Sequence, residues 1–398
     1  MRLFLIRFVC LAIILLMQTG CWDNLELNEI GLVTGIAIDK GKQHMYQFTV
    51  ELSSPSEFSV KKTSGNSPSI LYSLEGDSIA ELSNKMNVGL SRRLVYTHTR
   101  IIVIGEALAR EGTLEFLKYL QASREIRDTA KVFLAKGAQA RDILGIAFPI
   151  DTVASKKLSS QLESGQSDWG MYPDVMLKTV IADMISNGRQ PVMAAVTVRG
   201  PIEEGGTMEA DRKIKPPAIL EIIGMGIFKK EKLLGFVPLT DIRSYLWTQD
   251  QLKTTNITQS CGNKKKFIVT VYHSHTGIKA RYVNEKPHIK VRLRMEGRIE
   301  SYQCKEDTTK IATYQALEKK TNDYINKMVE GTIHKVQKSY GVDIFGFGEE
   351  MERQHFDQFK KVRDDWDEEF TRADIQVDVE VKIRHGGLIT NSFFDETK

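Results

Sequence analysis

The sequence predicts alternating strands and helices, of the α/β or α+β class, arranged in two or three domains behind a short apolar leader. The 398 residues are 41% hydrophobic and 27% charged, which is enough to bury a substantial core. Stretches with apolar residues at every second position alternate with stretches that repeat every three or four positions. This composition excludes a small disulfide-stapled peptide, a disordered chain and a polytopic membrane protein.

The N-terminus has the features of an export signal. Arg2 and Arg7 supply positive charge, and residues 8–17 form an unbroken apolar run, which is shorter than the roughly 20 residues that a spanning helix needs. A threonine and a glycine precede Cys21 as in a bacterial lipobox, although Gln18 stands where leucine is usual. We therefore expect Cys21 to begin the mature chain, carrying S-diacylglycerol and an N-acyl group. An uncleaved signal anchor or an export signal without lipid is the alternative.

The charge balance suggests no nucleic-acid partner. The chain has 55 basic and 51 acidic residues, and loss of the two leader arginines leaves 53 against 51. A nucleic-acid-binding protein usually concentrates an excess of basic residues on one face. The expected partner is membrane lipid, because each buried methylene of an acyl chain contributes about 0.8 kcal/mol. The folded body should then lie outside the bilayer.

After the predicted lipoprotein signal peptide of residues 1–20, residues 21–200 should form an N-terminal α/β region, which two subdomains could divide. Alternating apolar positions predict an opening hairpin, and Asp77 is placed to cap the first helix. The expected elements are strands 32–38 and 46–52 joined by a turn at 39–42, a helix after Asp77, strand 100–105, helical stretches from 106 to 121, strand 130–135, helices 138–144, 153–162 and 174–185, and strand 191–198.

A glycine- and proline-containing linker at residues 201–217 is expected to separate this region from a C-terminal α+β domain of residues 218–390, followed by a tail at 391–398. Periodicity again predicts the elements. They are a hairpin of 218–228 and 233–237, helix 241–247, a long β region from 267 to 302, a helix of about 30 residues starting near 311, and strand 375–383.

Two cysteines, Cys261 and Cys304, remain as ordinary side chains of the mature protein. If residues 283–286 close a two-residue hairpin, Lys265 faces Cys304 and Cys261 lies four residues further along. At about 3.3 Å per residue the gap is about 13 Å, beyond the limit of about 7 Å between bridged Cα atoms. Two free thiols are expected, unless the loop of residues 261–263 folds back and allows a disulfide.

The sequence motifs predict no catalytic, cofactor-binding or metal-ligating residue. His273 and His275 share a strand face, but a third and a fourth zinc ligand are missing. Gly224 and Gly226 lack the third glycine of a dinucleotide fingerprint and fit a bulge or a close backbone contact better. The acids of residues 349–369 fit a solvated helix face, since a calcium loop has different spacing.

Residues 340–348 combine glycines and an aspartate with Phe345 and Phe347, directly after the long helix. Such a segment could present a specific contact to a partner. The other interpretation is a tight turn between helices, with both aromatic rings in the core.

Several short sequence motifs together resemble those of the Ger(x)C family of spore germination lipoproteins, over essentially the whole mature chain. They are Cys21-Trp22-Asp23, Glu26-Leu27, Gly35-Ile36-Ala37-Ile38-Asp39, Arg92-Arg93-Leu94, His98, Ile104-Gly105-Glu106, Ala109-Arg110-Glu111-Gly112, Arg124-Glu125-Ile126-Arg127, Ala135-Lys136-Gly137, Gly224-Met225-Gly226-Ile227-Phe228, Leu246-Trp247, Val336-Gln337, residues 340–348, Trp366 and Phe370.

This resemblance implies a multidomain α+β fold of mixed and antiparallel sheets with packed helices. It also implies the C subunit of a nutrient germinant receptor, which works with integral-membrane A and B subunits on the outer surface of the spore inner membrane. The family implies no enzyme activity and no cofactor, and only Cys21 carries over with a defined chemical role. Two rival functions are an extracytoplasmic solute-binding lipoprotein that captures the germinant itself and an envelope enzyme acting on peptidoglycan.

Overall fold

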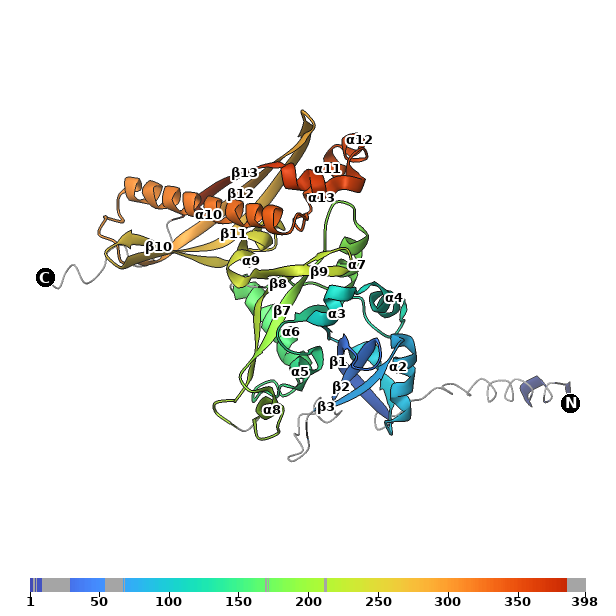
Figure 1. The fold of residues 1–398 in the computed structure, drawn as a ribbon. Helices are drawn as coiled ribbons and strands as arrows, with labels where there is room; N and C mark the ends of the chain where they lie inside the picture. The colour runs from blue at the N-terminus through green and yellow to red at the C-terminus, as the bar shows by residue number, and fades with distance from the viewer. Residues whose placement is uncertain are drawn as a thin grey trace.

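The computed structural model describes residues 29–53, 67, 69–168, 170, 172–210 and 213–384, together with residues 1, 2, 4 and 6–8. These residues form a nine-stranded sheet, here sheet A, and a four-stranded sheet, here sheet B. Sheet A occupies the lower body in Figure 1, and sheet B forms an arm above it. The α+β class with mixed sheets and packed helices is confirmed.

Sheet A is mixed, with parallel central strands and antiparallel flanks. The parallel pairs join β1 to β5, β5 to β6 and β6 to β7, and the short β4 also pairs with β1. In spatial order the strands are β3 (Ser69–Gly76), β2 (Tyr46–Ser53), β1 (Ile30–Lys40), β5 (Ile101–Gly105), β6 (Lys131–Ala135), β7 (Val192–Arg199), β8 (Ile219–Lys229) and β9 (Lys232–Pro238), with β4 (Arg93–Val95) beside β1.

Helices cover both faces of sheet A, because the central strands are apolar on both sides. In β5, Ile101 and Val103 pack into one core, and Ile102 and Ile104 pack into the other. The first core includes α5 (Ala140–Gly145) and α6 (Ala154–Asp168). The second core includes α2 (Ile79–Lys85), α3 (Glu106–Glu111), α4 (Leu114–Ala122), α7 (Leu177–Ile185) and α9 (Leu239–Thr248).

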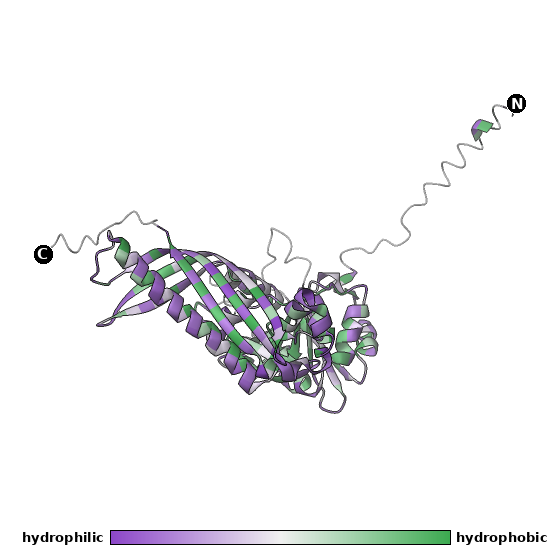
Figure 2. Cartoon of the chain, turned by 90° about the horizontal axis from the view of Figure 1, so that it is seen from above, coloured by the Kyte–Doolittle hydropathy of each residue, from purple (hydrophilic) through white to green (hydrophobic). Residues whose placement is uncertain are grey.

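Sheet B has the order β10 (Thr255–Gly262), β11 (Lys265–Val283), β12 (Lys286–Tyr302) and β13 (Asp374–Ile383). Its buried face packs against the long helix α10 (Ile311–Ser339) through Ile325, Val329 and Ile333. Hydropathy alternates along its strands, as expected when only one face is buried (Figure 2). The short helices α11 (Phe347–Gln354), α12 (Phe356–Phe359) and α13 (Trp366–Arg372) connect α10 to β13.

Most predicted elements are present, with local corrections. Ser78, and not Asp77, caps α2, because the Asp77 carboxylate accepts the Met45 backbone N–H at 2.9 Å instead. The helical stretches predicted between 106 and 121 are α3 and α4, which are separated at Gly112, whose φ is +148°. The strands β3 and β10 were not predicted.

The linker predicted at residues 201–217 contains the short helix α8 (Ile202–Gly205) and joins two neighbouring strands of sheet A. β8 pairs with β7, and β9 pairs with β8, so the sheet continues across this segment. The chain passes to sheet B only after α9. The assignment of residues 218–390 to a separate domain stays a prediction.

The expectation of two free thiols is wrong, because Cys261 and Cys304 form a disulfide with Cα atoms 5.9 Å apart. Asn263 and Lys264 adopt positive φ and turn β10 back along β11. β10 and the end of β12 then lie on either side of the start of β11, and Cys261 sits at an irregularity between Ser260 and Gly262. The loop does fold back, which removes the gap expected from the hairpin register.

Candidate functional site

The predicted lipidation site, Cys21, lies outside the described residues. The body of the described chain begins at Glu29, whose backbone carbonyl accepts the Arg93 N–H at 2.9 Å. Within the described part of the chain, no helix is both long and apolar enough to cross a membrane.

Two buried carboxylates attach helices to sheet A. Asp39 accepts the backbone N–H groups of Ala140 at 2.7 Å and Arg141 at 2.9 Å, at the start of α5. Glu51 accepts the Thr34 hydroxyl at 2.8 Å and the Ser155 N–H at 3.4 Å, at the start of α6. Burial raises the pKa of both carboxyl groups, although the hydrogen bonds oppose the rise. Each group satisfies helix N–H donors, which is a structural role.

The segment of residues 340–348 is organised by one buried carboxylate. Asp343 accepts the backbone N–H groups of Phe345, Gly346 and Gly348 and the indole N–H of Trp366, each at 2.9 Å. Burial raises its pKa to about 6, opposed first by the Trp366 hydrogen bond. Since Phe345 and Phe347 are fully buried, the second interpretation is confirmed: the segment is a turn with its aromatics in the core.

The junction between the body and the arm contains a charged cluster that sequence reasoning missed. Arg189 lies 3.0 Å from a carboxylate oxygen of Glu349, and Ser186 donates to the other oxygen at 3.0 Å. Burial raises the pKa of nearby Asp183 to about 7, which Arg189 opposes and Glu349 reinforces. Burial also raises the pKa of Tyr245 in α9. These residues come from α7, α9, α11 and the loop before β7, so no local pattern marks them as a group.

Backbone contact holds this junction closely together. A Cβ atom added at Gly188 would lie 2.4 Å from the backbone nitrogen of Glu349. Gln190 donates its backbone N–H to the Asp343 carbonyl at 2.7 Å and accepts the Lys230 N–H at 2.7 Å. The turn at residues 340–348 therefore helps to attach the arm to the body.

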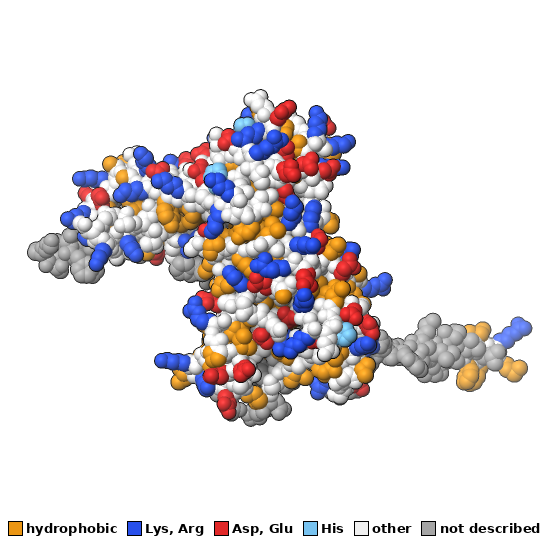
Figure 3. Space-filling model, viewed as in Figure 1, with side chains coloured by type: hydrophobic (Ala, Val, Ile, Leu, Met, Phe, Trp, Pro, Cys, Tyr) orange, Lys and Arg blue, Asp and Glu red, His pale blue; other side chains and the backbone are white. Residues whose placement is uncertain are grey.

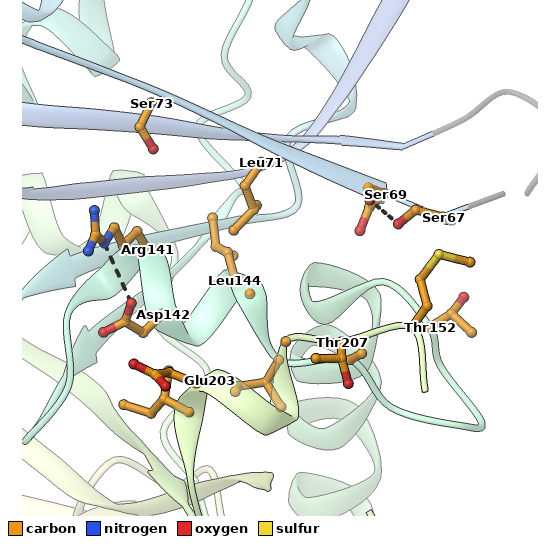
Figure 4. Close-up of a pocket in the computed structure, with 16 residues that line it drawn as sticks. Ser67, Ser69, Leu71, Ser73, Arg141, Asp142, Leu144, Thr152, Glu203 and Thr207 are labelled. Atoms are coloured by element: carbon orange, nitrogen blue, oxygen red, sulfur yellow. Dashed lines mark hydrogen bonds and ion pairs between the residues drawn. The ribbon is translucent and has the colours of Figure 1, made fainter. Parts of the chain in front are cut away.

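A polar cleft of about 440 Å³ opens between β3, α5 and the segment that includes α8. Figure 4 shows its walls, with Leu71 and Leu144 between groups of polar side chains. Several of the polar groups already have partners within the chain. Ser67 donates to the Ser69 carbonyl at 2.6 Å, and Asp142 accepts the Gln139 N–H at 3.2 Å and pairs with Arg141. The cleft contains no convergent pair of buried acid and base among the described residues.

The remaining predicted positions have structural surroundings. His273 lies opposite Glu296, and His275 lies 3.3 Å from an Asp250 carboxylate oxygen. The described residues include no group of three side chains that could hold a metal ion. A Cβ atom at Gly224 would lie 2.2 Å from the Val237 carbonyl oxygen, which confirms close backbone contact there. Basic and acidic side chains are interspersed over the face shown in Figure 3.

Comparison with known protein families matches both halves of the chain. Residues 23–198 match the model described as the spore germination protein N-terminal domain. Residues 223–387 match the model described as spore germination B3/GerAC like, C-terminal.

Individual relatives extend over nearly the whole chain. Spore germination protein KC of Bacillus subtilis (strain 168) is 29% identical, with 97% of this chain and 98% of that protein covered. Spore germination protein B3 of the same organism is 24% identical over 96% of this chain and 98% of its own length. The crystal structure of the GerBC protein has a similar fold, with a TM-score of 0.54, 21% identity, and coverage of 88% of this chain and 97% of that one.

Proposed function

The chain belongs to the Ger(x)C family of spore germination proteins, and on that premise we propose that it is the non-catalytic C subunit of a nutrient germinant receptor. It assembles with integral-membrane A and B subunits. Acylated Cys21 holds it on the outer surface of the spore inner membrane. The observation that carries the proposal is the continuous similarity to germination proteins across both halves of the chain.

The structure supports a non-catalytic role through its buried acids. Asp39, Glu51 and Asp343 are the kind of perturbed carboxylates that often mark an active site. Here each one accepts at least two hydrogen bonds, including at least one from a backbone N–H group, and none lines the polar cleft. Their environment is that of structural groups.

Gene deletion in a sporulating host that lacks redundant receptors tests the role in germination. The deletion strain should fail to release dipicolinate on nutrient addition but should still germinate when dipicolinate is supplied directly. Complementation with the intact chain should restore the nutrient response. Normal nutrient germination of the deletion strain would overturn the proposal.

The anchor is tested by Cys21→Ala, with Cys10→Ala as the matched control because that cysteine lies within the predicted leader. Only Cys21→Ala should abolish incorporation of labelled fatty acid. Pull-down from solubilised spore membranes should recover the A and B subunits with the intact chain. An acylated chain that recovers neither subunit would contradict the assembly.

A further inference from the structure

An apolar groove lies at the end of sheet A where the body of the described chain begins. Its walls include Leu52, Ile70, Leu90 and Leu94, while Arg92, Gly31 and four serines complete the lining, and its volume is about 190 Å³. Leu52 and Leu94 are buried, but Ile70 of β3 is 52% exposed. The groove is therefore open to the surroundings along β3.

An exposed rim of mixed character adjoins this groove. Val88 is 87% exposed at the end of the 3₁₀ turn Met86–Val88, four and five residues before the exposed Arg92 and Arg93. Neither arginine has an ion-pair partner within the described residues. We call Ile70, Val88, Arg92 and Arg93 the basic rim. Exposed apolar side chains near exposed guanidinium groups suit the boundary between lipid headgroups and acyl chains.

The start of the described body fixes which end of the molecule lies near the bilayer. The Glu29 backbone carbonyl accepts the Arg93 N–H, and Glu29 lies eight positions after Cys21 along the chain. Eight residues reach at most about 28 Å when fully extended. A lipid on Cys21 would thus keep Glu29, and Arg93 beside it, within about 28 Å of the membrane surface. β1–β3 and α2 lie at the bottom of the molecule in Figure 1, and the arm lies at the opposite end.

We propose that the basic rim docks on the bilayer itself, with Val88 and Ile70 at the acyl boundary and Arg92 and Arg93 on the phosphates of anionic phospholipids. This proposal rests on the anchoring of Cys21 in the proposed function. Lipid is favoured over a protein partner because the tether keeps this end within reach of the membrane surface and because the two guanidinium groups are complementary to anionic headgroups.

Depth-dependent quenching tests the contact in the full acylated chain, reconstituted in vesicles of phosphatidylcholine and phosphatidylglycerol. Since Cys261 and Cys304 are bonded and Cys21 is acylated, a cysteine introduced at position 88 is free for a fluorophore. Val88→Cys should be quenched by nitroxide-labelled lipids. Ile185→Cys is the matched control, because Ile185 is 76% exposed at the end of α7, close to the junction with the arm. Equal quenching at both positions would overturn the proposal.

The charge contribution is tested in the same assay. The ratio of docked to undocked protein should fall at least about fivefold for each arginine changed in Arg92→Glu and Arg93→Glu, because each change removes a positive charge and adds a negative one, and the fall should need phosphatidylglycerol. The control pair Lys279→Glu and Arg281→Glu changes exposed basic residues of sheet B and should leave docking unchanged.

Two outcomes separate the proposal from its alternatives. A change in the fluorescence of the label at position 88 that appears only after the A and B subunits are added would show that the basic rim contacts a protein partner. That result would overturn docking on lipid. Fatty-acid labelling of Cys21 is scored separately in every sample. If the chain is acylated but the fluorophore at position 88 is not quenched, docking of the basic rim is refuted and lipid anchoring through Cys21 is not.

Discussion

At the scale of single residues, buried polar groups hold the turns and helix starts of this protein in place. Asp343 is the clearest case, because a single carboxylate accepts three backbone N–H groups and the indole of Trp366. An isosteric amide has one acceptor oxygen, and its NH₂ group would face N–H donors. The turn therefore depends on the charge and on the shape of this side chain.

We predict that Asp343→Asn lowers the free energy of unfolding by about 2–4 kcal/mol, since unsatisfied buried donors cost about 1–3 kcal/mol each and partial relaxation will recover some of the loss. Urea unfolding followed by tryptophan fluorescence measures the change. Asp357→Asn, an exposed position in α12, is the control and should stay within about 0.5 kcal/mol of the parent. Similar midpoints for the two variants would contradict the assigned role.

Asp183 gives the protein a predictable pH dependence. Its carboxyl faces Arg189, Glu349 and Tyr245 at the junction, and burial raises its pKa from 3.8 to about 7. The folded state thus binds this proton more tightly than the unfolded state. Its contribution to stability is present below pH 4 and is lost as the pH rises towards 7.

Asp183→Asn should remove this loss, so that stability between pH 4 and 7 declines less steeply in the variant than in the parent. The difference in slope is at most about 1.4 kcal/mol per pH unit, the limit for one proton. Urea unfolding at a series of pH values measures both slopes. Asp128→Asn changes an exposed acid and should follow the parent. Parallel curves for Asp183→Asn and the parent would refute the prediction.

At the scale of elements, the spacing of apolar residues predicted those strands and helices in which buried residues recur at a regular interval. β5 is buried on both faces, buried and exposed residues alternate in β13, and α10 has a continuous apolar stripe. The type of each element can therefore be predicted from its own sequence. β3 and β10 lie at sheet edges, where only part of each strand is buried. Their patterns are therefore weak, and long-range pairing decides their structure.

Missing β10 also caused the error about the cysteines. The two-residue hairpin predicted at residues 283–286 is present, because Val283 pairs with Lys286, but its register says nothing about a strand that returns along the other side of β11. Residues 340–348 were recognised as unusual, yet their role depended on Trp366, which lies 23 residues from Asp343. Contacts between segments that are far apart in the sequence cannot be predicted from composition or from the spacing of apolar residues.

We predict that the Cys261–Cys304 disulfide stabilises sheet B. It closes a separation of 43 residues, for which the chain-entropy account gives about 4 kcal/mol as an upper value. Reductant should lower the urea midpoint of the parent chain. The double variant Cys261→Ser and Cys304→Ser should start from the lower midpoint and should not respond to reductant. Identical midpoints for reduced and oxidised parent would contradict a stabilising role.

At the scale of the whole molecule, one apolar core extends from sheet A into sheet B. It includes Ile104 of β5, Trp247 of α9 and Val271 of β11. α9 connects the two parts directly, because Ser244 donates to the Met328 carbonyl at 3.2 Å and Thr276 donates to the Trp247 carbonyl at 2.5 Å. The sequence suggested a boundary from composition, but the physical coupling of the two parts depends on this shared core.

This coupling predicts that body and arm unfold together. Calorimetry of the purified mature chain in detergent should give one transition, with a calorimetric enthalpy close to the van't Hoff enthalpy. Reduction of the disulfide should move that whole transition, and hydrogen exchange should report the loss in β5 as well as in β12. A chain of this size often divides into independent domains, so two transitions are the natural alternative. Two resolved transitions, or loss of protection in sheet B alone after reduction, would show that the shared core is too weak to join the two parts.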